Sequence, residues 1–370
     1  MTAATSTALP SDNGGKDLGI FLPMANGGWI LSSNTPTLDG SYSYNREVAR
    51  LADEAGYDFI MAMAKWRGYG GETQHWCYSL ESQMLMAGLA EVTSRVKVWA
   101  TCHTLLQNPA VTAKMMTTLD HISGGRAGLN VVNGSYKGEF DQMGAWREDL
   151  GHDERYDYAE EWIECIKRLW KESSVTYDGK YFRLDDCQSD PKPMADPRPF
   201  LVCAGTSGRG MRFTVDQMDA IFLSGKDNAE LAEKSRLAKS MAAESGRSIK
   251  TYTMMTLVIG ETDEAAQATA AHYVDGFDEG AWQGMMRAYG FLDAEIGKQN
   301  AMTEKSRSGF MSAHIIGSVE TVTRELSSIF EDTDLNGMML IFPDYLSGVP
   351  LFAERILPVL RERFPAAVAA

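Results

Sequence analysis

Asn130 and Thr101 are well placed to act on a bound molecule, because each lies near the end of an apolar run in this 370-residue sequence. An asparagine amide has two donor hydrogens and an acceptor oxygen, which can hold a polarised oxygen or a ring edge. His103 follows Thr101 by two residues, and an imidazole side chain ordinarily titrates near neutral pH. We see no carboxylate pair for a glycosidase and no cluster of His and Asp for a metal hydrolase. These residues predict a site that orients a reactant, without a catalytic metal.

Each of these side chains also has a purely structural interpretation. Asn130 can satisfy the backbone of the next loop, Thr101 is an ordinary β-branched strand residue, and His103 can serve as a simple hydrogen-bonding residue. The small-residue loop Ala204–Gly208 offers a second type of site, because it opens a helix. Backbone N–H groups there, together with the Ser207 hydroxyl, can cradle a phosphate or simply cap the helix.

Arg155 and Tyr156 lie in the first turns of a helix that we predict over 153–171. A guanidinium in that position can bind a phosphate bidentately, or it can form a surface ion pair. The apolar cluster of Met61, Met63 and Trp66 is more typical of a core than of a pocket.

Short apolar runs alternate with longer amphipathic stretches along the chain. Many of the runs are apolar throughout, which is typical of a parallel sheet covered by helices. Eight β/α units predict an α/β protein with a (β/α)₈ TIM barrel and insertions, with a doubly wound open sheet as the alternative. The predicted strands are 18–24, 59–66, 96–103, 127–133, 200–205, 220–223, 251–259 and 337–342. The predicted helices are 44–56, 80–94, 109–123, 153–171, 228–244, 319–330 and 351–364.

The predicted domain organisation is a loose tail over 1–17 followed by a single barrel over 18–370. One insertion is expected near 175–195, where 175–184 alternates like a small hairpin. A second insertion is expected near 276–311, as a lid or an oligomer contact.

Composition and charge exclude several kinds of partner. A net charge of -15 argues against a nucleic-acid partner, which requires clustered Lys and Arg. The five cysteines form no CxxC or zinc pattern, so we expect free thiols in a reducing compartment. No apolar run reaches the roughly 20 residues that span a membrane, and the first residues lack the apolar core of a signal peptide. The expected location is the cytoplasm, with no membrane partner.

Several segments of the sequence match a known pattern. Together they resemble the luciferase-like, two-component flavin-dependent monooxygenases, and among them the pyrimidine oxygenases, from about 18 to 364. The matching segments are Gly19–Pro23, Asn26–Trp29, Leu80–Ser82, Leu85–Ala90, Val92–Arg95, Asp120–Arg126, Glu139–Gly144, Arg155–Tyr158, Cys203–Gly205 and Asp344–Gly348.

The resemblance implies a flavin-dependent monooxygenase that takes reduced FMN from a separate reductase, with NAD(P)H used only by that reductase. Dioxygen is the second reactant, and a homo-oligomer is expected. By resemblance, Thr101 and Asn130 are the catalytic residues that hold dioxygen beside the flavin ring. The positions that match flavin contacts are Ala64, Lys65, Asn130, Glu139, Arg155, Tyr156 and Ser207.

The sequence departs from the family pattern on the expected substrate side. Ser135 stands where the family has tryptophan, and Cys102 and His103 stand where it has small residues. A change from tryptophan to serine opens space and removes a stacking surface. With Met63, these residues form the predicted substrate pocket for a small electron-poor molecule, such as a pyrimidine-like N-heterocycle or a related ring.

Three other functions remain possible on the same barrel. One is a deazaflavin (F420)-dependent oxidoreductase that transfers hydride without oxygen, and another is a non-catalytic flavin-binding protein. The third is an isomerase or aldolase, which would require a strand-end acid pair or lysine, and Lys65 is the candidate lysine.

Overall fold

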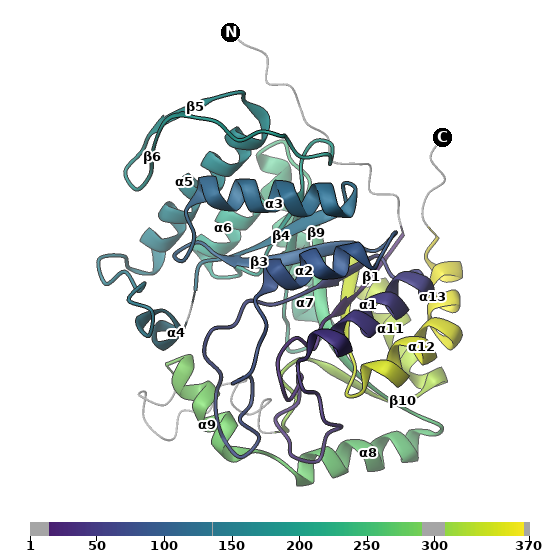
Figure 1. The fold of residues 1–370 in the computed structure, drawn as a ribbon. Helices are drawn as coiled ribbons and strands as arrows, with labels where there is room; N and C mark the ends of the chain where they lie inside the picture. The colour runs from purple at the N-terminus through teal and green to yellow at the C-terminus, as the bar shows by residue number, and fades with distance from the viewer. Residues whose placement is uncertain (1–14, 135, 291–307, 366–370) are drawn as a thin grey trace.

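The computed structural model describes residues 15–134, 136–290 and 308–365, and eight parallel strands in this part of the chain close into a barrel (Figure 1). The ring closes because β8, the last strand in the order along the sheet, pairs in parallel with β9. The predicted (β/α)₈ TIM barrel is therefore confirmed. The barrel strands, in order around the ring, are β1 (Asp17–Phe21), β2 (Phe59–Met61), β3 (Lys97–His103), β4 (Ala127–Val132), β7 (Phe200–Cys203), β8 (Ala220–Phe222), β9 (Lys250–Gly260) and β11 (Gly337–Ile341).

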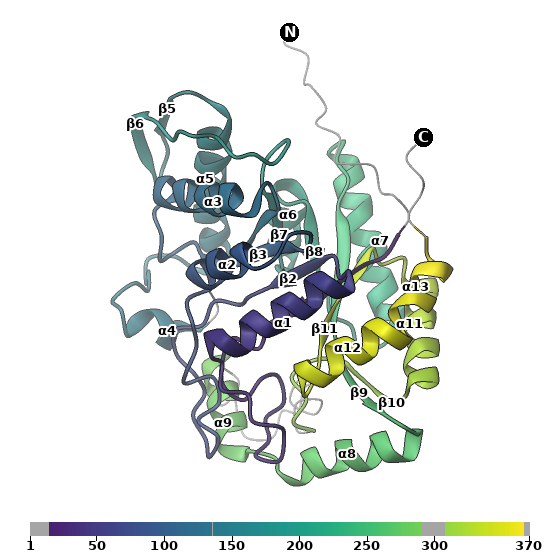
Figure 2. The same cartoon turned by 45° about the vertical axis from the view of Figure 1, so that its right-hand side comes forward.

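Helices surround the barrel on its outer face, and Figure 2 shows two of them, α1 and α12, side by side. Asn108 caps one of them, α3, by accepting from the backbone of Ala110, with Pro109 in its first turn. The main helices are α1 (Tyr42–Ala55), α2 (Ser82–Glu91), α3 (Pro109–Ser123), α4 (Lys137–Asp141), α5 (His152–Lys171), α6 (Gly208–Gln217), α7 (Asn228–Glu244), α8 (Asp263–Asp275), α9 (Glu279–Ala288), α11 (Val319–Thr333), α12 (Tyr345–Arg355) and α13 (Leu357–Arg363).

Aromatic rings fill the barrel interior. Phe59 and Trp99 stack with centroids 4.0 Å apart, and Tyr252 packs against both. Glycines on neighbouring strands make room for them, since a Cβ on Gly19 would lie 2.4 Å from Phe59 and one on Gly128 2.3 Å from Trp99. The barrel is therefore a packed core, and open chemistry is confined to the carboxyl ends of the strands.

The two expected insertions have different places in the fold. The first contains the hairpin of β5 (Val175–Asp178) and β6 (Arg183–Cys187). The second contains α9, while 291–307 lie outside the described residues, as do 1–14 of the expected tail. Both views place the hairpin on the far side of the molecule from α9 (Figures 1 and 2). Only the second insertion therefore approaches the carboxyl ends of the strands.

Two local expectations were wrong, and two elements were missed. The helix expected over 351–364 begins at Tyr345, with Pro350 inside it, and breaks at Ile356 into α12 and α13. The strand expected over 59–66 ends at Met61, and the carbonyl of Ala62 accepts from the side chains of Ser82 and Thr101. α8 and β10 (His314–Ser318) were not expected at all, and β10 extends the edge of β9 beyond the end of β8.

Gly124 ends α3 in a left-handed backbone conformation. It has φ +67°, and no heavy atom lies within 4 Å of the place that a Cβ would take, so Gly124→Ala adds backbone strain without a steric clash. We expect the free energy of unfolding to fall by about 1 kcal/mol in urea denaturation. Gly208→Ala is the matched control, since that glycine has equal space and no positive φ, and it should not destabilise. Equal effects of the two changes would contradict this account.

Candidate active site

Asn130 and Thr101 lie opposite each other on β4 and β3, where their side chains meet inside the barrel. The Asn130 Nδ2 donates to Thr101 Oγ1 at 3.1 Å, and Thr101 Oγ1 donates to the carbonyl of Ala62 at 2.6 Å. The Thr101 hydrogen is thereby committed to the backbone. Both side chains are buried. The structure thus brings the two predicted catalytic residues together, as one hydrogen-bonded unit.

Ser82 holds this unit in place. Its hydroxyl donates to the Ala62 carbonyl at 3.0 Å and accepts from the backbone N–H of Thr101 at 2.8 Å. Asn130 Oδ1, in contrast, is buried and has no partner among the described residues. A buried acceptor without a partner is costly, so it fits a bound molecule that supplies a donor. One amide hydrogen of Asn130 also remains available.

Lys65 and Glu139 form a buried ion pair beside this unit, with Lys65 Nζ 3.6 Å from Glu139 Oε2. The backbone N–H of Trp66 donates to the other carboxylate oxygen at 2.5 Å. Both side chains are less than a tenth exposed. Lys65 and Glu139, both predicted as flavin contacts, are thus joined by a charge pair between the β2–α2 loop and α4.

Aromatic rings surround the Lys65 ammonium. Its Nζ lies 4.6 Å from the ring centroid of Tyr69, 5.0 Å from that of Tyr136 and 5.8 Å from that of Trp76. Burial lowers the pKa of Lys65, and the charge of Glu139 opposes that shift. The rings retain a cation that water cannot reach. None of the three aromatic residues was expected from the sequence, since each comes from a loop.

Tyr156 and Ser207 meet at the N-terminus of α6. Ser207 caps this helix, accepting from the backbone of Gly210 at 3.1 Å, and the Tyr156 phenol approaches the same glycine. A Cβ on Gly210 would lie 2.4 Å from the Tyr156 Oη, and one on Gly205 would lie 3.2 Å from it. The glycines therefore let the phenol approach the first turn, whose N–H groups lack partners within the helix.

Arg155 precedes Tyr156 in the first turn of α5. Its guanidinium lies 5.0 Å from the Trp146 ring and donates to the Leu150 carbonyl at 3.2 Å. Ala64, the remaining predicted flavin contact, is half-buried directly before Lys65. The predicted contacts thus fall in two groups, one around Lys65 and one around Ser207.

His103 and Met63 are the predicted substrate residues that the structure places at the barrel mouth. His103 is buried, and its Nδ1 accepts from the Trp66 indole N–H at 3.2 Å. Burial, and then the charge of Lys65, lower the pKa of His103 to about 4. Met63 is buried in the segment that follows β2. Ser135, the other predicted substrate residue, lies outside the described residues.

Cys102 does not join this group. Strand side chains alternate, so Cys102 faces away from Thr101 and His103. Its Sγ lies 3.1 Å from Gln107 Oε1, under the helices, and the thiol is buried. Its assignment to the substrate pocket is therefore not supported. The assignment rested on the departure from the family pattern and did not consider that neighbouring strand residues face opposite sides.

The β2–α2 loop and α9 cover the mouth together. Asp278, which caps α9, accepts from the backbone of Glu72 and from both the backbone and hydroxyl of Thr73. The hydroxyls of Tyr69 and Tyr289 hydrogen-bond at 3.0 Å. Both views show α9 next to α4 (Figures 1 and 2). The second insertion is thus fastened to the loop that carries Lys65.

His75 is buried in this cover, and neither of its ring nitrogens has a partner among the described residues. Its ring stacks against Trp76 and Tyr69. His75→Phe should raise the free energy of unfolding by about 1–2 kcal/mol at pH 7, because it keeps the stacking and leaves no unpaired polar atom. Urea denaturation measures this difference, and a loss of stability would contradict it.

The same variant should also remove a pH dependence. Burial lowers the pKa of His75 to about 4, against the charge of Asp278, whereas the unfolded value is about 6.5. As the pH falls through this window the unfolded chain takes up a proton and the folded protein does not, so stability is lost. At 1.36 kcal/mol per unit, wild type should lose about 2 kcal/mol more than His75→Phe between pH 7 and pH 5. Equal losses would argue against an uncharged buried His75.

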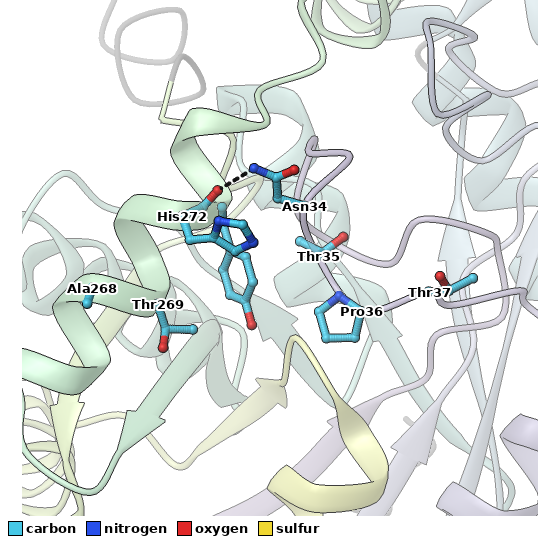
Figure 3. A pocket seen from close by; sticks show the side chains of 8 residues that line it. Asn34, Thr35, Pro36, Thr37, Ala268, Thr269 and His272 are labelled. Atoms are coloured by element: carbon cyan, nitrogen blue, oxygen red, sulfur yellow. Dashed lines mark hydrogen bonds between the residues drawn. The ribbon is translucent and has the colours of Figure 1, made fainter.

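An outer hollow of about 640 Å³ lies between the 34–37 loop and α8 (Figure 3). Asn34 donates to the backbone carbonyl of His272 at its edge, at 2.9 Å. None of the predicted site residues lines it, and it is open to solvent. We therefore place the candidate active site at the barrel mouth. Among the described helices, none is long and apolar enough to cross a membrane.

Comparison with known proteins agrees with this architecture. The family model for luciferase-like monooxygenases matches residues 17–335. The pyrimidine monooxygenase RutA of Variovorax paradoxus is 38% identical over 356 residues, covering 94% of this chain and 95% of that protein. RutA of Acinetobacter baylyi is 36% identical, with 94% and 95% covered.

Solved structures share the fold at lower identity. Riboflavin lyase RcaE, solved with modified FMN and riboflavin, has a TM-score of 0.83 at 23% identity, covering 96% of this chain and 93% of that one. EDTA monooxygenase EmoA from Chelativorans sp. BNC1 has a TM-score of 0.79 at 20% identity, covering 96% of both chains.

The barrel fold, the matching family model and the named monooxygenase relatives together place the chain among (β/α)₈ oxidoreductases. The chain belongs to the luciferase-like monooxygenase family. The predictions of this family and of a flavin-dependent monooxygenase are thereby confirmed.

Proposed function

We propose that this enzyme uses reduced FMN, supplied by a separate reductase, and dioxygen to oxygenate a small electron-poor ring. The observation that carries the proposal is the paired Asn130 and Thr101, with an unpartnered buried amide oxygen at the barrel mouth. The name of the RutA relatives suggests a pyrimidine as the ring. A cytoplasmic location and a homo-oligomer remain parts of this proposal.

The residues present fit FMN at both ends of that molecule. The phosphate would sit on the first turn of α6, with Ser207, Tyr156 and Arg155, where Gly205 and Gly210 let the phenol approach the backbone. The polar edge of the ring would meet the unpartnered Asn130 Oδ1, which accepts a ring N–H. When bound, FMN would supply the activation of dioxygen.

The chain's own residues would position and shield the reactants. Asn130 has one uncommitted amide hydrogen, which points to it as the donor toward a reacting oxygen, whereas the Thr101 hydroxyl is committed to Ala62. Thr101 is therefore the residue that fixes the amide. The Tyr69, Trp76 and α9 cover would exclude water, which strengthens each polar interaction inside.

The test supplies purified protein with FMN, a flavin reductase and NADH, and offers uracil under ¹⁸O₂. We expect product that carries one ¹⁸O atom, with oxygen consumption that depends on the reductase. A panel of other N-heterocycles, halogenated aromatics and organosulfur compounds tests the substrate class if uracil is inert.

Two outcomes would favour other functions. Substrate oxidation without oxygen uptake, supported by reduced deazaflavin, would indicate hydride transfer. Tight binding of oxidised flavin with no reductase-dependent turnover of any panel member would indicate a flavin-binding protein.

A further inference from the structure

His103 is one residue of the mouth whose chemistry the proposed function leaves unused. It follows Thr101 by two positions on β3, so both side chains face the barrel interior. The imidazole is 6% exposed. Its ring meets the edge of Phe140 at 5.1 Å, with the two planes 81° apart.

Trp66 decides which ring nitrogen of His103 carries the proton. An indole N–H can only donate, and it points at His103 Nδ1 from 3.2 Å. His103 Nδ1 must therefore be the unprotonated acceptor, and a neutral imidazole then carries its hydrogen on Nε2. Among the described residues, no hydrogen bond involves Nε2. Burial and the Lys65 ammonium both lower the pKa of His103, so the ring is neutral at physiological pH.

Trp66 is itself held from both sides of its peptide unit. Its N–H donates to Glu139 Oε1 at 2.5 Å, and its carbonyl accepts from Gln142 Nε2 at 2.7 Å. Both partners come from the α4 segment, which also supplies Phe140 against His103. The imidazole therefore has a fixed direction and a fixed tautomer.

We propose that the Nε2–H of His103 recognises a hydrogen-bond acceptor on the substrate, and that Trp66 is the positioning residue that fixes this tautomer. The inference rests on the proposed function and narrows its substrate class. The acceptor is a ring carbonyl oxygen or an unprotonated ring nitrogen. The nearby Lys65 ammonium disfavours a cationic ring. A substrate without an acceptor leaves a buried donor unpaired, which costs about 10- to 100-fold in binding.

The first test needs neither flavin nor turnover. Protein labelled with ¹⁵N-histidine is examined by NMR, and His103 is assigned by its loss in His103→Ala. We expect the Nε2–H tautomer down to pH 5 and a shift of its resonance when uracil or 2-pyridone is added. Toluene, which lacks an acceptor, should leave it unchanged. Trp66→Phe should give a mixture of tautomers. The Nδ1–H tautomer in wild type, or no shift with either acceptor-bearing ring, would overturn the proposal.

The second test uses turnover of the substrate found in the oxygen-incorporation panel. His103→Ala should raise KM about 10- to 100-fold with kcat within a few fold, and His103→Gln, which restores an N–H donor, should recover part of the loss. Trp66→Phe should raise KM less. His272→Ala, at the exposed outer hollow, is the control and should change neither constant. Unchanged KM in His103→Ala contradicts the proposal. An enzyme that turns over no panel member contradicts the proposed function, while the NMR result still decides the role of His103.

Discussion

Asn130→Ala is expected to lower product formation by about 100- to 1000-fold, while flavin binding becomes weaker through the loss of the Oδ1 acceptor but stays measurable. The size follows from the loss of one oriented donor at the position where charge develops, in a buried site. The amide is held by Thr101, Ala62 and Ser82, so its direction is set before any reactant binds. Such a fixed dipole requires no reorganisation during the reaction. The measurement compares oxygen consumed with ¹⁸O found in the product.

Two companion variants separate the parts of the unit. Asn130→Asp keeps the shape and the acceptor but loses the amide donor, so it should be nearly as impaired as the alanine variant. Thr101→Val keeps the shape and loses the hydroxyl that orients the amide, so we expect a smaller loss of about 10-fold. Turnover of Asn130→Ala within twofold of wild type would show that the donor has been assigned to the wrong residue.

The positions of the barrel strands could be predicted from the sequence because buried parallel strands are apolar throughout. The early end of β2 could not be predicted, since Ala62 belongs to the same apolar run as the strand. Its carbonyl instead accepts from Ser82 and Thr101. Those bonds join segments that are distant in sequence, and no periodicity reports them.

Several segments that carry the family resemblance have structural roles. The Arg126 guanidinium donates to the carbonyls of Ala90, Thr93, Val96 and Ser123, which ties the end of α2 to the end of α3. Such a segment identifies the family reliably because the fold depends on it. It says nothing about substrate, which is why the fold was easier to predict than the pocket.

Strand alternation decides which of the predicted site residues on β3 face the barrel interior. Thr101 and His103 share one face of β3, and Cys102 between them takes the other. Trp66 was interpreted as a core residue, yet the residue is 37% exposed, and its indole N–H donates to His103, 37 positions away. A contact of that kind depends on how the loop after β2 meets the end of β3, which requires the folded barrel.

The buried pair of Lys65 and Glu139 should have the largest effect on stability. Lys65→Met leaves a carboxylate that is 5% exposed, with the Trp66 N–H as its hydrogen-bond donor among the described residues. Removing one partner of a buried pair costs about 3–5 kcal/mol, because the remaining charge loses its compensation. We expect this loss in urea denaturation of flavin-free protein. Glu139→Gln should cost less, since Lys65 keeps its three rings and can lose its proton.

The double variant Lys65→Met with Glu139→Gln decides whether the pair acts as a unit. It removes both charges, so its free energy of unfolding should be only about 1–2 kcal/mol below that of wild type. This loss is far smaller than the sum of the two single losses. Lys137→Met is the matched control, because Lys137 pairs with Glu148 in the same region but is half-exposed, and it should cost at most about 1 kcal/mol. If Lys65→Met cost no more than this control, the two charges would be solvated in solution. That result would contradict a barrel mouth that is closed to water. If instead the single losses simply added, Lys65 and Glu139 would be stabilised by separate partners, and the cover formed by the loop and α4 would not depend on their attraction.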